Sequence, residues 1–333
     1  MFAFVMKISK LVFCILLSSP IAFADYLNCL DSVSAAVLAE KAQLNQEYLA
    51  IDPVYGALKK DNESRIQLGT NGKAAIILHG YAESPNRVMS LANSIHELGY
   101  TTLEPLLPGF GSSAKVANET SSKRWQASLE RALIQVSPCV DSIVVAGFSL
   151  GATIITDFLL NNPRVSRDGF YKTESGKLIK IESAILAAPF YDLPIAVPDF
   201  FIWLATTKLK SVDTKQAYDM FHLPDLRSIA NDPLYNNTNM PIVAGRNAVF
   251  YGERVRDSVK TLSSVPVLAV FSEADGTINL TTSTNLVRRH FIHTQTYTLT
   301  KKQQVPHQVL APDANPYLGP LLQTAKTFVA GHS

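Results

Sequence analysis

The sequence predicts an α/β fold in which a mostly parallel central sheet is covered by helices on both faces. Two observations carry this prediction. From residue 74 onward, continuous apolar strand patterns alternate with amphipathic helix patterns, as is typical of parallel sheets buried on both faces. The chain also has 333 residues, of which 47% are hydrophobic and only 17% charged, so it can bury a large core.

The elements before the middle of the chain follow in a regular order. An N-terminal helix over 31–50 starts at a capping residue, Asp31 or Ser32, and carries apolar residues at helical spacing. A Thr-Asn-Gly turn then separates a short strand from the first strand of the apolar core. We predict strands at 66–68, 74–79, 101–106 and 142–147, and amphipathic helices at 86–98 and 122–136.

The second half repeats this alternation after a long interruption. A helix begins at Leu150, directly after the strand 142–147. We predict further strands at 183–190, 265–272 and 294–300, and helices at 279–290 and 316–330. Between residues 191 and 264 the strand patterns disappear, and the segment is too long for a loop between a strand and a helix. We therefore predict a helical lid over 191–264, inserted into a core formed by 73–190 and 265–333.

The first residues have the pattern of a secretory signal. A basic flank precedes the apolar run 11–17, and small residues follow at Ala22 and Ala24. This pattern predicts a signal peptide over 1–24 and a periplasmic or secreted protein. The apolar run is too short for a stable membrane span, so we expect none in the mature chain. An uncleaved anchor is the alternative.

Two cysteines remain once the signal is removed. Cys14 is lost with it, which leaves Cys29 in the lead-in segment 25–72 and Cys139 in the core. In an oxidising compartment such a pair predicts a disulfide. Two unrelated buried thiols are the alternative.

The stretch "VVAGFSLGAT" carries the strongest functional signal. Ser149 stands at the end of a buried strand and at the start of an apolar helix, between Gly147 and Gly151. The spacing G-x-S-x-G in this context is a nucleophile elbow, because the sharp turn needs small neighbours and displays the serine hydroxyl. An ordinary strand-to-helix turn is the alternative.

A serine nucleophile needs a base and an acid that orients the base. The elbow fold places the acid and then the histidine after the serine. Asp275 follows a buried strand at the sheet edge where functional groups gather, and Glu273 is its rival. His307 lies in the loop after the last strand, so we predict it as the base. The other histidines are less suitably placed: His79, His96, His222, His290, His293 and His332.

The negative oxygen that forms during acyl transfer needs two backbone N–H donors. We expect them at Leu150, which follows the nucleophile, and at Tyr81, in the loop after the strand "AIILHG". His79 precedes this loop, and we interpret it as a residue that shapes it.

Other classes of site find no support in the sequence. There is no H-E-x-x-H, no Cys/His cluster with ligand spacing and no G-x-x-x-x-G-K, so we predict no metal and no cofactor. The formal net charge is +2 without a run of like charge, so nothing indicates nucleic acid or an anionic membrane surface.

These motifs together carry a family resemblance. With "ILHGYAESP", "AGFSLGA", "VPVLAVFSEADGTI" and the His307 loop, the chain resembles the α/β-hydrolase superfamily. The branch is that of monoacylglycerol lipases, lysophospholipases, small carboxylesterases and serine aminopeptidases. The resemblance implies an eight-stranded sheet with a lid after the sixth strand. It also supports Ser149, Asp275 and His307 as a triad, with Tyr81 and Leu150 as the oxyanion hole.

The sequence departs from the branch at several points. Phe148 and Phe110 occupy places where the branch commonly has histidine, and the residue before His307 is not small. The helix 31–50 lies outside the resemblance, so the first sheet strands are expected to be missing or replaced.

Together these observations predict an extracytoplasmic serine hydrolase that cleaves carboxylic esters, with a small-molecule acyl ester or a lipid as substrate. Phe200, Phe201 and Trp203 in the lid are predicted to line the acyl pocket, and pinning of the lid to the core is their alternative role. An aminopeptidase-like amidase, which would need lid carboxylates such as Asp199 or Asp213, is a second function. A non-catalytic binding protein on the same fold is a third.

Overall fold

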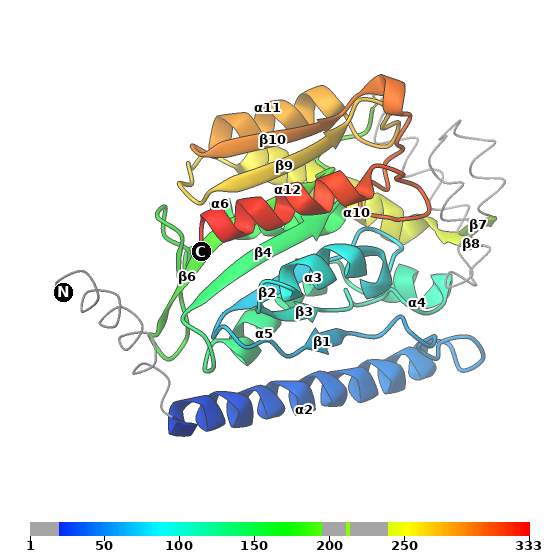
Figure 1. The fold of residues 1–333 in the computed structure, drawn as a ribbon. Helices are drawn as coiled ribbons and strands as arrows, with labels where there is room; N and C mark the ends of the chain where they lie inside the picture. The colour runs from blue at the N-terminus through cyan, green and yellow to red at the C-terminus, as the bar shows by residue number, and fades with distance from the viewer. Residues whose placement is uncertain (1–19, 195–210, 214–238) are drawn as a thin grey trace.

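The computed structural model describes residues 20–194, 211–213 and 239–333 (Figure 1). The predicted pocket residues Phe200, Phe201 and Trp203 and most of the predicted signal peptide lie outside these ranges. The prediction that the lid is helical therefore concerns mainly residues that are not described. In the described part of the chain, no helix is long and apolar enough to cross a membrane.

An eight-stranded, mostly parallel sheet forms the centre of the molecule (Figure 1). Seven strands lie in the order β1-β3-β2-β4-β6-β9-β10, and β5 pairs separately with β6. β1 and β5 are antiparallel to their neighbours, and all other pairs are parallel. The strands are β1 (Arg65–Gln67), β2 (Ala74–Leu78), β3 (Thr101–Glu104), β4 (Ser142–Phe148), β5 (Phe170–Lys172), β6 (Leu178–Ala187), β9 (Val267–Ser272) and β10 (Thr294–Leu299).

Helices cover both faces of the sheet, as the uninterrupted apolar strands require (Figure 1). α3 and α12 pack together on one face, and α5 and α6 on the other. α2 runs beside β1, α4 and α5. The helices are α2 (Pro20–Ile51), α3 (Met89–His96), α4 (Ala114–Glu119), α5 (Lys123–Val136), α6 (Leu150–Asn161), α10 (Ile242–Ser258), α11 (Leu280–His290) and α12 (Leu318–Gly331), with short 3₁₀ helices η1 (Pro85–Val88) and η2 (Lys301–Gln303).

Several predicted boundaries and elements are wrong. α2 begins at Pro20 and not at Asp31. Asp31 and Ser32 are residues that can cap a helix, but here they lie inside a helix that starts before them. β6 begins at Leu178, before the predicted 183. The segment predicted to lack strands contains β7 (Ser211–Asp213) and β8 (Asn239–Pro241), which pair with each other. Strands of this length are too short to show a periodic pattern.

The first strand of the sheet departs from the parallel pattern. β1 is antiparallel to β3 and pairs Ile66 with Leu103, so the edge is closed by a short strand that follows α2 in the chain. β5 brings the sheet to eight strands, as the resemblance implied.

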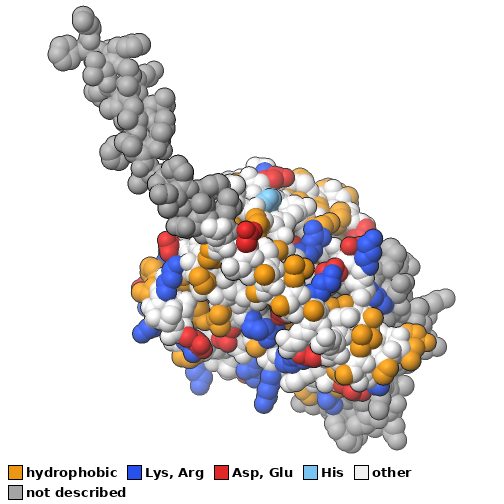
Figure 2. Space-filling view, turned by 90° about the horizontal axis from the view of Figure 1, so that it is seen from below, with side chains coloured by type: hydrophobic (Ala, Val, Ile, Leu, Met, Phe, Trp, Pro, Cys, Tyr) orange, Lys and Arg blue, Asp and Glu red, His pale blue; other side chains and the backbone are white. Residues whose placement is uncertain are grey.

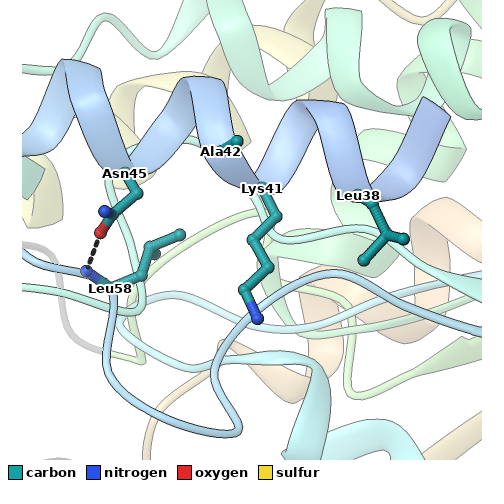
Figure 3. Close-up of a pocket in the computed structure, with 5 residues that line it drawn as sticks. All are labelled: Leu38, Lys41, Ala42, Asn45 and Leu58. Atoms are coloured by element: carbon teal, nitrogen blue, oxygen red, sulfur yellow. Dashed lines mark hydrogen bonds between the residues drawn. The ribbon is translucent and has the colours of Figure 1, made fainter. Parts of the chain in front are cut away.

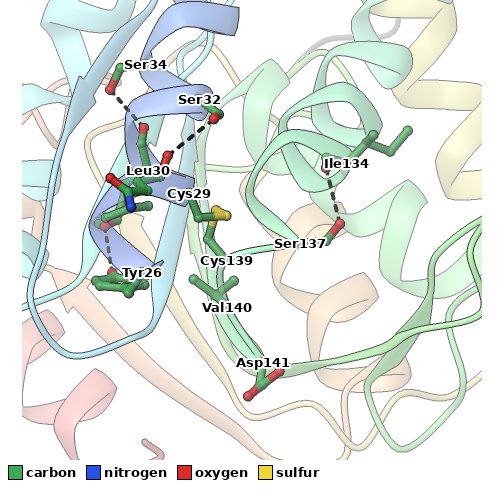
Figure 4. The surroundings of a disulfide bond; sticks show 12 residues. Tyr26, Cys29, Leu30, Ser32, Ser34, Ile134, Ser137, Cys139, Val140 and Asp141 are labelled. Atoms are coloured by element: carbon green, nitrogen blue, oxygen red, sulfur yellow. Dashed lines mark hydrogen bonds between the residues drawn. A yellow bond between two sulfur atoms is a disulfide. The ribbon is translucent and has the colours of Figure 1, made fainter. Parts of the chain in front are cut away.

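A disulfide joins α2 to the segment before β4 (Figure 4). The predicted pair, Cys29 and Cys139, is bonded, with the two Cα atoms 5.6 Å apart. Close by, the Tyr26 hydroxyl is 3.2 Å from Thr101 Oγ1 on β3. The buried face of α2, which includes Val33, adds apolar contacts to the core. The helix is thus held to the sheet by covalent, polar and apolar contacts.

We expect removal of this disulfide to lower the free energy of unfolding. The bond spans a sequence separation of 110 residues. Closing a loop of that length stabilises by about 4 to 5 kcal/mol in the chain-entropy account, and this is an upper figure. Urea unfolding of Cys29→Ser/Cys139→Ser beside the parent protein measures the loss. An unchanged urea midpoint, or two free thiols in the denatured, unreduced parent protein, would contradict the prediction.

The outer side of α2 is mixed in character. Figure 2 shows hydrophobic, basic and acidic side chains interspersed on this face, with no single-sign patch. Leu38 is 65% exposed and borders a shallow pocket of about 270 Å³ (Figure 3). The pocket is lined by Leu38, Lys41, Ala42, Asn45 and Leu58. These residues lie on α2 and in the segment that follows it, and neither carries Ser149, Asp275 or His307, so the pocket is separate from the candidate active site.

Candidate active site

Ser149 lies on the sharp turn between β4 and α6. Its φ of 51° falls in the left-handed region, where residues with a side chain are rarely found outside functional turns. A Cβ on Gly147 would lie 2.5 Å from the carbonyl carbon of Gly151, and a Cβ on Gly151 would lie 2.4 Å from the carbonyl oxygen of Leu78. Both glycines are therefore required by close backbone contacts, as the G-x-S-x-G pattern predicts.

Neighbouring strands hold this turn in place. The Ser149 N–H donates to the carbonyl of Ala187 at the end of β6 (2.9 Å). Thr153 Oγ1, one turn into α6, donates to the Phe190 carbonyl at 2.6 Å. The turn is thus anchored to the segment that follows β6, and its conformation does not depend on the serine side chain.

The imidazole of His307 bridges the serine and a carboxylate. Its Nε2 lies 2.8 Å from Ser149 Oγ, and its Nδ1 lies 2.7 Å from Asp275 Oδ2. A carboxylate only accepts, so Nδ1–H donates to Asp275, and Nε2 of the neutral ring accepts from the serine hydroxyl. The His307 side chain is 6% exposed and that of Asp275 is fully buried. The three predicted side chains therefore form one hydrogen-bonded chain.

Asp275 is oriented by the backbone of its own loop. Its Oδ1 accepts from the N–H groups of Thr277 (2.8 Å) and Ile278 (3.3 Å), which leaves Oδ2 for the imidazole. The rival Glu273 is exposed and points elsewhere, since its Oε2 accepts from the Lys301 N–H at 2.8 Å. The structure thus brings Asp275, and not Glu273, to His307.

The remaining described histidines lie apart from Ser149 Oγ. Three of them contact backbone carbonyls near the surface: His96 that of Tyr100, His290 that of Thr261, and His332 that of Phe328. His293 is exposed, and His222 lies outside the described residues.

His79 has a structural place beside the loop that carries Tyr81. The Leu107 N–H donates to its Nε2 (2.9 Å), so Nδ1–H donates to the Gly80 carbonyl (2.8 Å). Burial lowers the pKa of His79 to about 4, so the ring is neutral at ordinary pH. Its two nitrogens are both used in joining the loops after β2 and β3, as the interpretation of a shaping residue requires.

The loop after β2 contains a buried carboxylate that sequence reasoning missed. Glu83 is 2% exposed, and its Oε2 accepts from the Gly80 N–H at 3.0 Å. Ala82 has a φ of 52°, so the chain turns tightly between these residues. An acidic residue three positions after a turn glycine was the available signal. The carboxylate fixes the backbone that leads into Tyr81.

The two expected oxyanion donors lie at this end of the sheet. Leu150 is the first residue of α6, so its N–H has no partner within the helix. Tyr81 follows β2, the strand that pairs directly with β4. The Tyr81 hydroxyl is not the expected donor, because it donates to the Pro241 carbonyl at 2.6 Å.

Aromatic rings occupy the two places where the similar branch commonly has histidine. The Phe148 ring lies 4.9 Å from the His307 ring and packs against it. Phe110 stacks on Trp125 at 5.6 Å and meets the edges of His79 and Tyr81. These departures therefore change the packing around the site and leave the hydrogen-bonded chain intact. The described residues contain no group of histidine, cysteine and acidic side chains that could hold a metal ion.

Comparisons with known proteins agree with this fold. A family model described as serine aminopeptidase, S33, matches residues 70–311. A thermostable monoacylglycerol lipase from Bacillus sp. (strain H-257) is 28% identical over 96 residues, which span 28% of this chain and 38% of that lipase.

Solved structures with the same fold include two monoacylglycerol lipases. The enzyme from Paleococcus ferrophilus superposes with a TM-score of 0.56 at 15% identity and covers 81% of this chain and 98% of its own. The Saccharomyces cerevisiae monoglyceride lipase gives 0.57 at 14% identity, with 81% and 91% covered. A structure reported for the metagenome-derived lipolytic enzymes LipS and LipT gives 0.58 at 14% identity, with 83% and 100% covered. Fold and family model lead to one assignment: the chain belongs to the serine aminopeptidase S33 family of α/β-hydrolases.

Proposed function

We propose that the protein is a serine hydrolase that cleaves carboxylic esters through an acyl-enzyme. The observation that carries the proposal is the chain from Ser149 Oγ through His307 to Asp275, with contacts of 2.8 and 2.7 Å. A serine hydroxyl becomes a nucleophile when a base is in hydrogen-bond reach and a third group orients that base. Each of these conditions is met by a described side chain.

The first half-reaction forms a bond between Ser149 Oγ and the acyl carbon. His307 Nε2 takes the hydroxyl proton as the bond forms, and the carbonyl electron pair moves onto oxygen. When the intermediate collapses, the bond to the alcohol oxygen breaks and His307 returns the proton to that oxygen. Water then attacks the acyl carbon of the acyl-enzyme while His307 takes its proton. The bond to Ser149 Oγ breaks, His307 returns the proton to this oxygen, and the carboxylic acid leaves. Asp275 stabilises the imidazolium throughout.

The developing oxyanion would be held by the N–H groups of Leu150 and Tyr81. Preformed backbone donors cost no reorganisation during the reaction, and loss of one such donor typically costs about 10² to 10³ in rate. Gly151 allows the start of α6, with Leu150, to lie directly against the end of β2. The hydrogen bond from the Gly80 N–H to Glu83 holds the loop that carries Tyr81.

We assign the substrate class to esters of fatty acids or other small acids, monoacylglycerols among them. The support is the lipase name of the Bacillus relative and the apolar character of "PDFFIWLATTKL". In this proposal Phe200, Phe201 and Trp203 line the acyl pocket of a helical lid.

We also propose that the protein acts outside the cytoplasm. The signal pattern over residues 1–24 supports export, and the bonded pair Cys29 and Cys139 fits an oxidising compartment.

An amidase is the second candidate, because the matching family is described as serine aminopeptidases. It would need a carboxylate to bind the substrate amine, and the sequence offers Asp199 and Asp213. A non-catalytic role has less support, since such a protein would be expected to have lost part of the hydrogen-bonded chain.

A fluorophosphonate probe tests the proposal directly. We expect one probe molecule to bind covalently to Ser149 in the parent protein, and peptide mass spectrometry identifies the residue. Parallel assays with acyl esters and with aminoacyl anilides separate the two enzymatic candidates. Labelling without turnover of either substrate class, or labelling of another serine, would contradict ester hydrolysis at Ser149.

A further inference from the structure

The start of α10 is fixed to the loop that carries the expected oxyanion donor. The Tyr81 hydroxyl donates to the Pro241 carbonyl, one residue before the helix, at 2.6 Å. A Cβ on Gly245 would lie 3.1 Å from this hydroxyl, so the first turn of the helix packs directly on the tyrosine. Asn118 Oδ1 accepts from the N–H groups of Val243 and Ala244. Polar contacts from the core therefore hold the beginning of α10.

A row of aromatic rings makes a second connection between the same two segments. Tyr81 meets Phe110 edge-on at 5.7 Å, and Phe110 stacks on Trp125 at 5.6 Å. Trp125 in turn meets Tyr251, two turns further along α10, at 6.4 Å. The tyrosine side chain thus contacts α10 through its hydroxyl and the segment after β3 through Phe110, and Trp125 of α5 links Phe110 to Tyr251.

The Tyr81 backbone lies between two constrained neighbours. Gly80 on one side is bound to Glu83, and Ala82 on the other side adopts a left-handed conformation. With its hydroxyl bonded to Pro241 and its ring against Phe110, the side chain limits how the Tyr81 backbone, and with it the N–H, can turn. Burial raises the pKa of the hydroxyl, so it remains a donor over the working pH range.

We propose that the Tyr81 side chain is a positioning residue, which aligns its own backbone N–H for the oxyanion only while α10 is docked on the core. This rests on the proposed ester hydrolysis. Transition-state stabilisation would then depend on the placement of a helix that contributes no group to the hydrogen-bonded chain of Ser149. Small displacements of a preorganised donor are costly, since a shift of about 1 Å can lower a rate by up to about 10²-fold.

The test is Tyr81→Phe, which keeps the ring and the backbone N–H and removes only the bond to Pro241. We expect kcat/KM for an acyl ester to fall about tenfold, mainly through kcat. The inhibition constant of a trifluoromethyl ketone, whose adduct with serine carries the oxyanion, should rise by the same factor. The dissociation constant of an ether analogue of the substrate, which forms no oxyanion, should be unchanged.

Tyr251→Phe is the matched control. It also removes a tyrosine hydroxyl bond at α10, here to Asp157 Oδ2 at 2.8 Å, but that bond leads to α6 and not to the oxyanion loop. Asp157 keeps its contacts with Arg254 and Asn161. We expect kcat and the ketone inhibition constant of this variant to stay within about twofold of the parent, since the start of α10 keeps its bonds to Tyr81 and Asn118 and the ring at position 251 keeps its place beside Trp125.

Hydrogen exchange decides the structural link without reference to catalysis. In Tyr81→Phe, amides at 80–83 and at 242–246 should both exchange faster, whereas Tyr251→Phe should leave 80–83 unchanged. Equal kinetic losses in the two variants, or an ether affinity that falls together with ketone affinity, would overturn the proposal. If the parent protein cleaves no ester, the proposed function fails on its own, and exchange confined to 242–246 in Tyr81→Phe would still refute the link.

Discussion

Ser149→Ala is expected to abolish ester hydrolysis while the protein keeps its fold. Removal of a triad nucleophile lowers kcat on the order of 10⁶-fold. The left-handed φ of 51° is equally demanding for serine and alanine, and the turn is held by backbone contacts to β6, so no large loss of stability follows. Initial rates on an acyl ester measure the effect, and thermal unfolding checks the fold.

Ser183→Ala provides the matched control for this experiment. Ser183 is fully buried on β6, next to the strand that leads into Ser149, and it takes no part in the hydrogen-bonded chain. This variant should hydrolyse esters within about twofold of the parent rate, because the buried Ser183 hydroxyl makes no hydrogen bond that its removal could break. Turnover retained in Ser149→Ala at more than about a hundredth of the parent rate would place the nucleophile elsewhere.

Asp275→Asn is expected to have the second largest effect, with kcat lower by about 10⁴-fold. An asparagine amide group facing Nδ1 favours the wrong tautomer of His307, so Nε2 carries a proton and cannot accept one from the serine. The geometry stays close to that of the parent, because Oδ1 can still accept from Thr277. Steady-state kinetics and fluorophosphonate labelling rates should fall together.

Glu273→Gln separates this prediction from a general effect of acidic residues in the loop. Glu273 is exposed and accepts from the Lys301 N–H, a bond that glutamine can also make. We expect its kcat to remain within about twofold of the parent, as for other surface changes away from the site. A severe loss in Glu273→Gln together with a mild one in Asp275→Asn would reverse the assignment of the acid.

The features that the sequence predicts well are those in which one local pattern has one structural cause. The turn at Ser149 is an example. A side chain at Gly147 would collide with the backbone of Gly151, and one at Gly151 would collide with the end of β2, the neighbouring strand in the sheet. The parallel core is another, since its strands are buried on both faces and therefore apolar throughout. Chain order, together with the position of His307 in the loop after the last predicted strand, was enough to single it out among the histidines.

Features that depend on distant contacts could not be predicted in this way. β7 and β8 are three residues each and exist as strands through their pairing. The bond between Tyr81 and Pro241 joins residues 160 positions apart, and no property of either residue alone indicates the other. The turn glycine three positions before Glu83 is a weak signal, and the burial of this carboxylate follows only from the folded loop. Local patterns indicate periodicity and turn chemistry, whereas contacts between distant residues become visible only in the folded structure.

The disulfide has a topological effect that is separate from its free energy. Bonding Cys29 to Cys139 encloses β1, β2, α3, β3, α4 and α5 in a covalent ring, and the chain leaves this ring just before β4 and Ser149. The exposed turn with Val54 and Tyr55, 74% and 73% accessible, lies inside the ring. A single proteolytic cut there would open the ring without releasing a fragment. The nicked enzyme would keep α2, the Tyr81 loop and Ser149 in one covalent molecule until the sulfurs are reduced.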